Sequence, residues 1–250
     1  MHNRIVWVLA LVALAGCEVI DAPLPASTPS ITLVQTTATA PALTSPALMA
    51  VPPAPVLLSR ALAARAIGDD VATGADLEVL LHTYPAAVEA RQARFFLAES
   101  QARRGLWTPA ADLLRSFVDE PLDDGLRAPA IFWLARCYES AGDHVGAAGL
   151  YQRYRDLATP LEPYAAIRQA AQHAAAGQLA EAADAYEHAA RADIVRGERA
   201  GSFERAIALR SQLASPAQGM ALYDELLALA QTPAYRARIL SEAAALAQQA

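Results

Sequence analysis

The sequence predicts an all-α protein in which antiparallel helix pairs stack in chain order as a right-handed superhelix, an α-solenoid. Two observations predict this fold. Small residues that suit a tight turn between two helices recur every 35 to 37 residues, and a fixed pattern of small and large apolar residues accompanies each of them. A repeat of this length is typical of solenoids and arrays. The turn residues are Gly68, Gly105, Gly142, Gly177 and Ala214.

The positions after each turn carry the packing pattern of the second helix of a pair. A small residue stands five positions after the turn and a large apolar residue nine positions after it. Small residues let antiparallel helices approach closely, and the large residue fills the groove between one pair and the next. The small residues are Thr73, Ala110, Ala147, Ala182 and Gly219, and the large ones are Leu77, Leu114, Tyr151, Tyr186 and Tyr223.

The positions before each turn repeat as well, and prolines follow the second helices. Leu97 and Leu134 stand eight positions before their turns, each followed by an alanine. Glycine at the turn permits the left-handed conformation that ends a helix, and proline stops the second helix. One pair cannot bury both of its faces, so neighbouring pairs must stack. The prolines are Pro85, Pro121, Pro160 and Pro233, after which residues 235–250 predict one further helix.

The segment from Ile131 to Ala147, with Tyr151 and Tyr154 after it, resembles the tetratricopeptide repeat. Phe95 to Phe117 and Gln169 to Ala189 are further copies, and the resemblance covers roughly residues 57–232. The segment from His82 to Pro85, followed by an alanine-rich helix, is similar to periplasmic lipoproteins of the β-barrel assembly machine and to cell-division coordinators.

The resemblance implies a protein or peptide partner bound on a concave surface that the first helix of each pair lines. Exposed aromatic residues rimmed by opposite charges suit such a partner. For Phe95 and Phe132 the alternative is that both rings pack between repeats. The residues implied are Gln92, Phe95, Glu99, Arg103, Phe132, Arg136, Glu139 and Tyr164.

The N-terminus predicts a secretory signal followed by a lipid anchor. Arg4 precedes eleven apolar residues, too few to span a bilayer but suited to the core of a signal peptide. The run from Leu14 to Cys17 matches the cleavage box of bacterial lipoprotein precursors. The match implies a signal peptide over residues 1–16, acylation of Cys17, and a place on the cell membrane or outer membrane facing the periplasm or exterior. An ordinary signal peptide with a chance cysteine is the alternative.

Residues 17–56 predict a tether between the anchor and a helical domain over residues 57–250. Prolines recur throughout this stretch among Ala, Ser and Thr. Proline removes backbone donors and fixes φ, so neither helix nor sheet propagates. The stretch is therefore expected to be a disordered spacer.

Composition and motifs favour binding over catalysis. A net charge of −6 spread along the chain disfavours nucleic acid as a partner. The five histidines lack metal-ligand spacing, so neither a metal nor another cofactor is expected. Cys137 lies in the apolar phase of its helix and is expected to be a buried, unreactive thiol.

One alternative function rests on a second resemblance. Glu99-Ser100 and Glu139-Ser140 match the start of the catalytic motif of soluble lytic transglycosylases, but the glycine-rich continuation is absent from both. Those enzymes can carry a long α-superhelix before the catalytic domain. The alternative is therefore that the chain is the superhelical part of such an enzyme without its catalytic domain.

Overall fold

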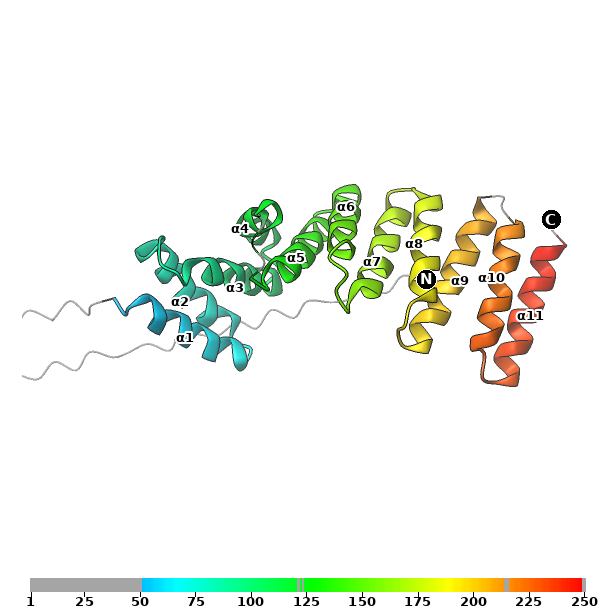
Figure 1. The fold of residues 1–250 in the computed structure, drawn as a ribbon, viewed down its shortest axis with the longest axis horizontal. Coiled ribbons are helices and arrows are strands. Elements are labelled where there is room, and N and C mark those ends of the chain that lie inside the picture. The colour runs from blue at the N-terminus through cyan, green and yellow to red at the C-terminus, as the bar shows by residue number, and fades with distance from the viewer. Residues whose placement is uncertain (1–50, 121, 123, 214–215, 249–250) are drawn as a thin grey trace, which may run out of the picture. The chain divides into compact units, whose positions relative to one another are not determined.

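The computed structural model describes residues 51–120, 122, 124–213 and 216–248, and this part of the chain is helical throughout, without strands (Figure 1). Cys17, the predicted signal peptide and the predicted tether up to residue 50 lie outside the described residues, as do Pro121 and Ala214. Within this described part, eleven helices follow one another: α1 (Ala54–Ala66), α2 (Asp70–Thr83), α3 (Ala90–Arg103), α4 (Trp107–Asp119), α5 (Arg127–Ser140), α6 (His144–Arg155), α7 (Glu162–Ala175), α8 (Leu179–Arg191), α9 (Arg196–Gln212), α10 (Pro216–Leu229) and α11 (Pro233–Ala247).

The main contacts join each helix with the next one along the chain, as the repeat predicts. Pairs form from α1 and α2, α3 and α4, α5 and α6, α7 and α8, and α9 and α10, with α11 following the last pair. None of the helices in the described residues is both long and apolar enough to cross a membrane.

Four turns within pairs share one backbone geometry, which confirms the predicted role of their glycines. Gly68, Gly105, Gly142 and Gly177 all have φ between 77° and 79°. In the third pair the amide of Asp143 donates to the carbonyl of Tyr138 at 3.0 Å, and the amide of Gly142 donates to that of Glu139 at 3.1 Å. These two bonds form a Schellman motif, which satisfies carbonyls at the end of a helix. The other three turns make the equivalent bonds.

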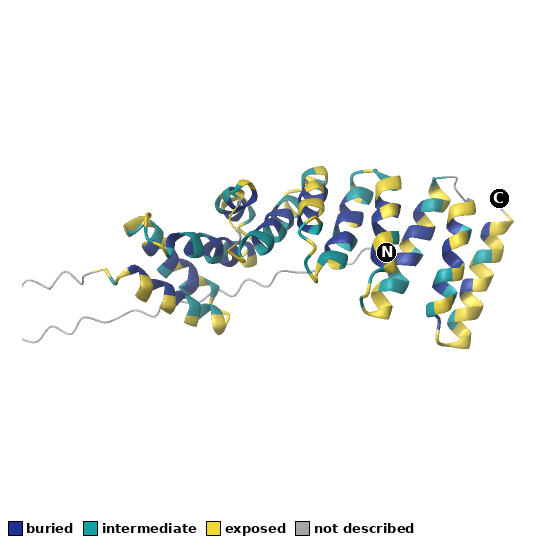
Figure 2. Cartoon of the chain, in the orientation of Figure 1, coloured by how far each residue is buried: buried dark blue, intermediate teal, exposed yellow. Residues whose placement is uncertain are grey.

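The repeated apolar positions form the core, which extends as a layer between successive helices (Figure 2). All ten residues predicted five and nine positions after the turns are buried. Leu97 and Leu134, eight positions before their turns, are also buried. The buried side chains group into three clusters, which lie along the chain around α1 to α3, α3 to α7, and α7 to α11.

Prolines begin helices here as well as follow them. Pro53 is the N-cap of α1 and Pro55 lies in its first turn, so α1 begins at Ala54, inside the range 17–56 expected for the tether. Proline is tolerated in a first turn because the missing N–H has no partner within the helix there. For the same reason Pro233 is the first residue of α11, whereas α10 ends at Leu229, before that proline is reached.

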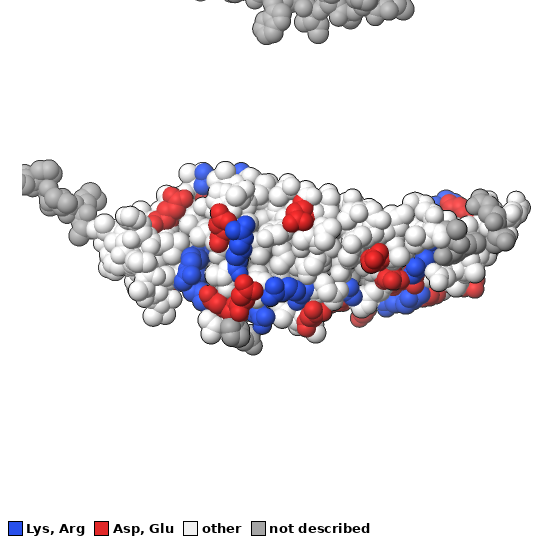
Figure 3. All heavy atoms as spheres, turned by 90° about the horizontal axis from the view of Figure 1, so that it is seen from above, with Lys and Arg blue, Asp and Glu red and all other residues white. Residues whose placement is uncertain are grey.

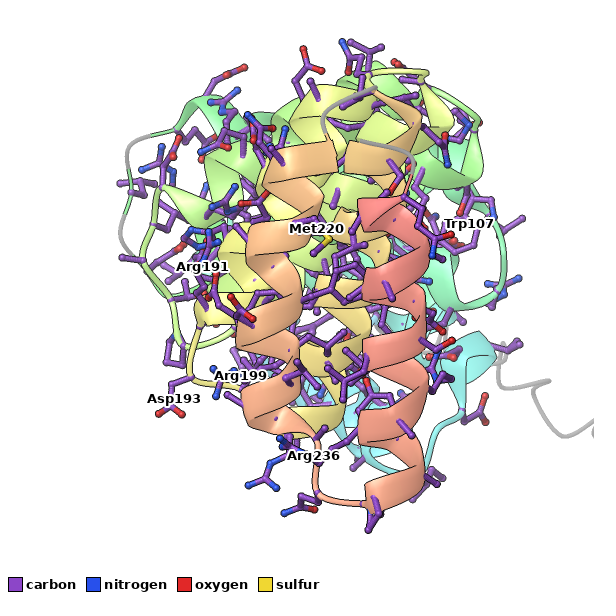
Figure 4. All side chains as sticks on the ribbon, turned by 90° about the vertical axis from the view of Figure 1, so that its right-hand side faces the viewer. Trp107, Arg191, Asp193, Arg199, Met220 and Arg236 are labelled. Carbon is purple, nitrogen blue, oxygen red and sulfur yellow. The ribbon has the colours of Figure 1, made fainter. Side chains whose placement is uncertain are left out.

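Helix α11 covers one end of the stack. Figure 4 looks at this end and shows α10 and α11 side by side, with Met220 between them. The side chain of Thr232 accepts a hydrogen bond from the amide of Tyr235 and caps the helix. Ile239 and Leu246 are buried, while Leu240 is exposed. This helix therefore shields the α9–α10 pair with one side and faces solvent with the other.

The backbone geometry predicts that alanine substitutions at two glycines of one repeat change the free energy of unfolding in opposite directions. Gly142→Ala is expected to lower the free energy of unfolding by about 1 kcal/mol, because an L-residue at positive φ is strained. Gly149→Ala, at an exposed helical site with open space around it, is expected to raise it by about 0.5–1 kcal/mol. Urea unfolding of both variants checks this, and destabilisation of equal size in both would contradict it.

Candidate functional site

The first helices of the pairs, α1, α3, α5, α7 and α9, present one surface, called here the first-helix face. Two positions connect successive first helices across it. At two of the four steps between first helices, the residue three positions before one turn contacts the residue nine positions before the next turn: Arg65 contacts Phe96, and Glu139 contacts Arg168. Three before the turn stand Arg65, Ala102, Glu139 and Ala174, and nine before it stand Phe96, Trp133, Arg168 and, counted from Ala214, Arg205.

At the α1–α3 end a nearly buried carboxylate bridges two arginines. The Glu99 carboxylate lies 2.8 Å from Arg65 Nε and 2.7 Å from Arg103 Nη2, and its side chain is only 8% exposed. The hydrogen bond to Glu99 raises the pKa of Arg65. The Arg65 guanidinium also lies 4.9 Å from the centre of the Phe96 ring. The charges of Glu99 and Arg103 are therefore paired within the chain. Gln92, another of the predicted residues, lies half-buried on the same helix.

The two predicted phenylalanines pack between helices. Phe95 is buried, with ring centroids 5.3 Å from Phe96 and 6.2 Å from Phe117. Phe132 is half-buried, with its ring edge-on to Tyr151 at 5.7 Å and to Tyr154 at 5.4 Å. Both rings therefore pack against neighbouring aromatic side chains, as the alternative interpretation of the sequence predicts.

In the middle of the face, Glu139 connects a buried tyrosine with an arginine. The Tyr151 hydroxyl donates to Glu139 at 2.7 Å, and Arg168 of the next first helix lies 3.1 Å from the same carboxylate. Burial, with the hydrogen bond to Glu139, raises the pKa of Tyr151 well above its ordinary value. Neighbouring Arg136 lies 5.7 Å from the Trp133 ring centre. The Glu139 carboxylate is therefore held in one place before any partner arrives.

A pocket of about 380 Å³ opens on this face between α5 and α9. Tyr164 and Ile167 give it an apolar wall, and Tyr164 is 38% exposed. Two of the predicted residues, Glu139 and Tyr164, meet here, while Arg136 and the residues around Glu99 lie outside its lining. Sequence reasoning missed the other seven lining residues, although comparison of the positions nine before each turn would have singled out two arginines. The missed residues are Ile167, Arg168, Ala171, Gln172, Tyr186, Glu198 and Arg205.

Acidic and basic side chains lie next to each other on the surface rather than in separate patches (Figure 3). Many of these pairs join residues about one repeat apart, such as Arg191 and Glu225 at 2.8 Å. A second polar concavity lies between α6 and α8. In its lining Glu162 accepts a hydrogen bond from Arg155 at 2.6 Å and contacts His188. Burial opposes ionisation of Glu162, but hydrogen bonds from these two partners lower its pKa overall.

Cys137 lines a small, mainly apolar pocket with Trp107 and Tyr138. Figure 4 shows Trp107 on the side of the stack opposite Arg191. The thiol is buried, and burial raises the pKa of Cys137 to about 11. The described residues contain no cluster of histidine, cysteine and acidic side chains arranged to hold a metal.

The pKa of Cys137 predicts an inert thiol in the folded protein. At pH 8 a thiol with a pKa of about 11 is ionised in roughly one molecule in a thousand. Iodoacetamide is therefore expected to leave Cys137 unmodified in the native protein and to alkylate it in urea, as mass spectrometry of the peptide that contains it would measure. Equal rates in both conditions would rule out the buried position.

The family model of the tetratricopeptide repeat matches residues 129–157, which contain most of α5 and all of α6. No curated protein matches the chain significantly.

Solved structures with similar folds include a crystal structure of MamA, with a TM-score of 0.57 and 15% identity over 72% of this chain and 98% of that one. MamA from Desulfovibrio magneticus RS-1 gives a TM-score of 0.54 and 11% identity over 70% and 94% of the two chains. Kinesin-light-chain-like repeats from Podospora anserina give 0.52 and 16% over 70% and 93%. The described helices therefore have the fold of a tetratricopeptide-repeat solenoid.

Proposed function

We propose that this protein is a lipid-anchored scaffold of the cell envelope that binds a protein or peptide partner on the first-helix face between α5 and α9, without catalysing a reaction. The observation that carries the proposal is the pocket in which a partly exposed tyrosine lies beside charged side chains on three different helices.

The composition of the pocket suits a protein partner. Tyrosine and arginine are enriched in the centres of protein interfaces, where they contribute most of the binding energy. Tyr164 offers a ring and a hydroxyl, Ile167 offers apolar surface, and Arg168 and Arg205 offer planar hydrogen-bond donors. A peptide side chain of ordinary size fits a volume of about 380 Å³.

The pocket is preorganised, which favours affinity. The Glu139 carboxylate accepts hydrogen bonds from the Tyr151 hydroxyl and from the Arg168 guanidinium. Gln172, another lining residue, is hydrogen-bonded to the imidazole of His144 at 2.8 Å. Side chains that are already fixed lose little conformational entropy on binding. The surrounding helices pack through buried alanines, so the backbone beneath the pocket is fixed as well.

The membrane part of the proposal rests on the sequence around Cys17. A short apolar run ending in Leu-Ala-Gly-Cys predicts lipidation at that cysteine, and the proline-rich stretch after it predicts a spacer. Acyl chains bind durably when two or more act together, since each buried CH₂ contributes about 0.8 kcal/mol. A scaffold attached in this way would present its binding face at a membrane surface.

The anchor predicts a result for the Cys17→Ala variant expressed in bacteria. The wild-type chain is expected to incorporate an alkyne-tagged palmitate analogue and to sediment with membranes, because the acyl chains insert into the bilayer. The variant is expected to lose both the label and the sedimentation. Labelling that persists in the variant would contradict acylation of Cys17, whereas an unlabelled wild type that is still secreted would favour an ordinary signal peptide.

The binding face predicts a difference between two photo-crosslinking positions in the full chain. A benzophenone side chain in place of Tyr164 is expected to capture a discrete partner in intact cells, because this residue forms the wall of the pocket. The same group in place of Val145, which is exposed on the second helix α6, is the matched control. Crosslinked bands, compared on gels and identified by mass spectrometry, check this. Identical bands from both positions, or none from Tyr164, would contradict the proposed face.

A further inference from the structure

The pocket on the first-helix face contains an arginine whose acidic partner is missing from the repeat. Between α5 and α7 the residue three before the turn is Glu139, and its carboxylate lies 3.1 Å from Arg168, nine before the next turn. Between α7 and α9 the equivalent residues are Ala174 and Arg205. The alanine has only a methyl group, so the carboxylate that the repeat geometry provides for Arg168 has no counterpart for Arg205.

Arg205 is held in place without being neutralised. Its guanidinium carbon lies 5.6 Å from the centre of the Tyr186 ring, and the residue is exposed. Among the described residues no carboxylate forms an ion pair with it, although Glu198 lines the same pocket. An arginine stacked on an aromatic ring keeps the edge of its planar fork free to donate two hydrogen bonds to one carboxylate.

We propose that this pocket takes a glutamate or aspartate side chain of a peptide partner, whose carboxylate pairs with Arg205 as Glu139 pairs with Arg168. An apolar side chain next to the acid in the partner packs on Tyr164 and Ile167. The inference rests on the proposed function, because it specifies the chemistry of a partner that binds the same face.

The charges around the pocket favour a single carboxylate over a more highly charged anion. Two arginines and two glutamates line the pocket, and one of these glutamates already pairs with Arg168. A phosphate group with nearly two negative charges would be repelled by Glu139 and Glu198, and the net charge of −6 disfavours polyanions at longer range. One additional carboxylate pairs with Arg205 and leaves the charged lining with a net charge of −1, whereas a phosphate group would leave nearly −2.

The test pans a phage-displayed library of random heptapeptides on the full chain. The expected result is enrichment of sequences with Asp or Glu next to an apolar residue. Enriched peptides are then synthesised with acetylated and amidated ends, so that side chains supply the only carboxylates, and their dissociation constants are measured by fluorescence anisotropy. Replacing the enriched acid with its amide is expected to weaken binding by about tenfold or more, because a hydrogen-bonded ion pair is lost.

Two variants and a control locate the effect. Arg205→Gln is expected to raise the dissociation constant of acidic peptides by about tenfold or more. Ala174→Glu is expected to do the same with an unchanged or raised melting temperature, because the new carboxylate occupies Arg205 from within the chain. Arg115→Gln removes another exposed arginine, on α4 and outside the pocket, and is expected to leave binding unchanged. Circular dichroism melts confirm folding, and Arg205→Gln alters only an exposed side chain.

The outcomes separate this inference from the proposed function. The inference is overturned if the enriched peptides lack acids. It is also overturned if acidic peptides bind the Arg205→Gln and Ala174→Glu variants as tightly as the wild type. Either result would still leave a face that binds peptides. A library without any enriched sequence also overturns it, and crosslinking at Tyr164 then decides separately whether this face binds a protein. The inference is supported if both variants lose binding of acidic peptides while the Arg115→Gln control keeps it.

Discussion

The close approach of two antiparallel helices at a glycine turn is the constraint on which this structure depends. The positive φ at four turns lets α1, α3, α5 and α7 end in the same Schellman motif, so the second helix of each of these pairs begins at the same place. Residues such as Ala147 and Ala182, with no exposed surface, then allow the second helix to lie against the first. Because these four pairs are closed in the same way, side chains at equal distances from their turns meet equivalent neighbours. That regularity places Glu139 next to Arg168.

The repeat also organises the surface charges. Arg65 and Glu99, Arg191 and Glu225, and Glu204 and Arg238 each join residues 34 positions apart. The two exposed pairs among these, Arg191 with Glu225 and Glu204 with Arg238, each contribute little stability, typically less than 1 kcal/mol. Their regular placement instead neutralises charges on neighbouring repeats within the chain. Of the two arginines that line the pocket, Arg168 has such a pair and Arg205 has none among the described residues, so a partner can recognise Arg205 by its charge.

Most of the fold was predictable from the sequence, because the turn glycines and the small and large residues after them recur at fixed distances. The buried state of Cys137 followed from its phase on the helix, and the structure confirms it. The pocket was less predictable. Phe95 and Phe132 matched the expected surface phase, yet edge-on contacts with neighbouring rings draw them inward. Arg205 was missed because its environment depends on Ala174 in the preceding repeat, a relation that appears only when successive helices are compared position by position.

Contacts limited mainly to sequential neighbours have a mechanical consequence. In such an array the stability of each segment depends on the interfaces directly beside it, so different parts open with different free energies. Helix α11 buries only one side and rests on a single pair, whereas α5 to α8 have neighbours in both directions. Fraying is therefore expected to begin at the α11 end and to advance inward one helix at a time. A ligand bound across α5, α7 and α9 would stabilise these helices and stop the progressive unfolding before it reaches the middle of the chain.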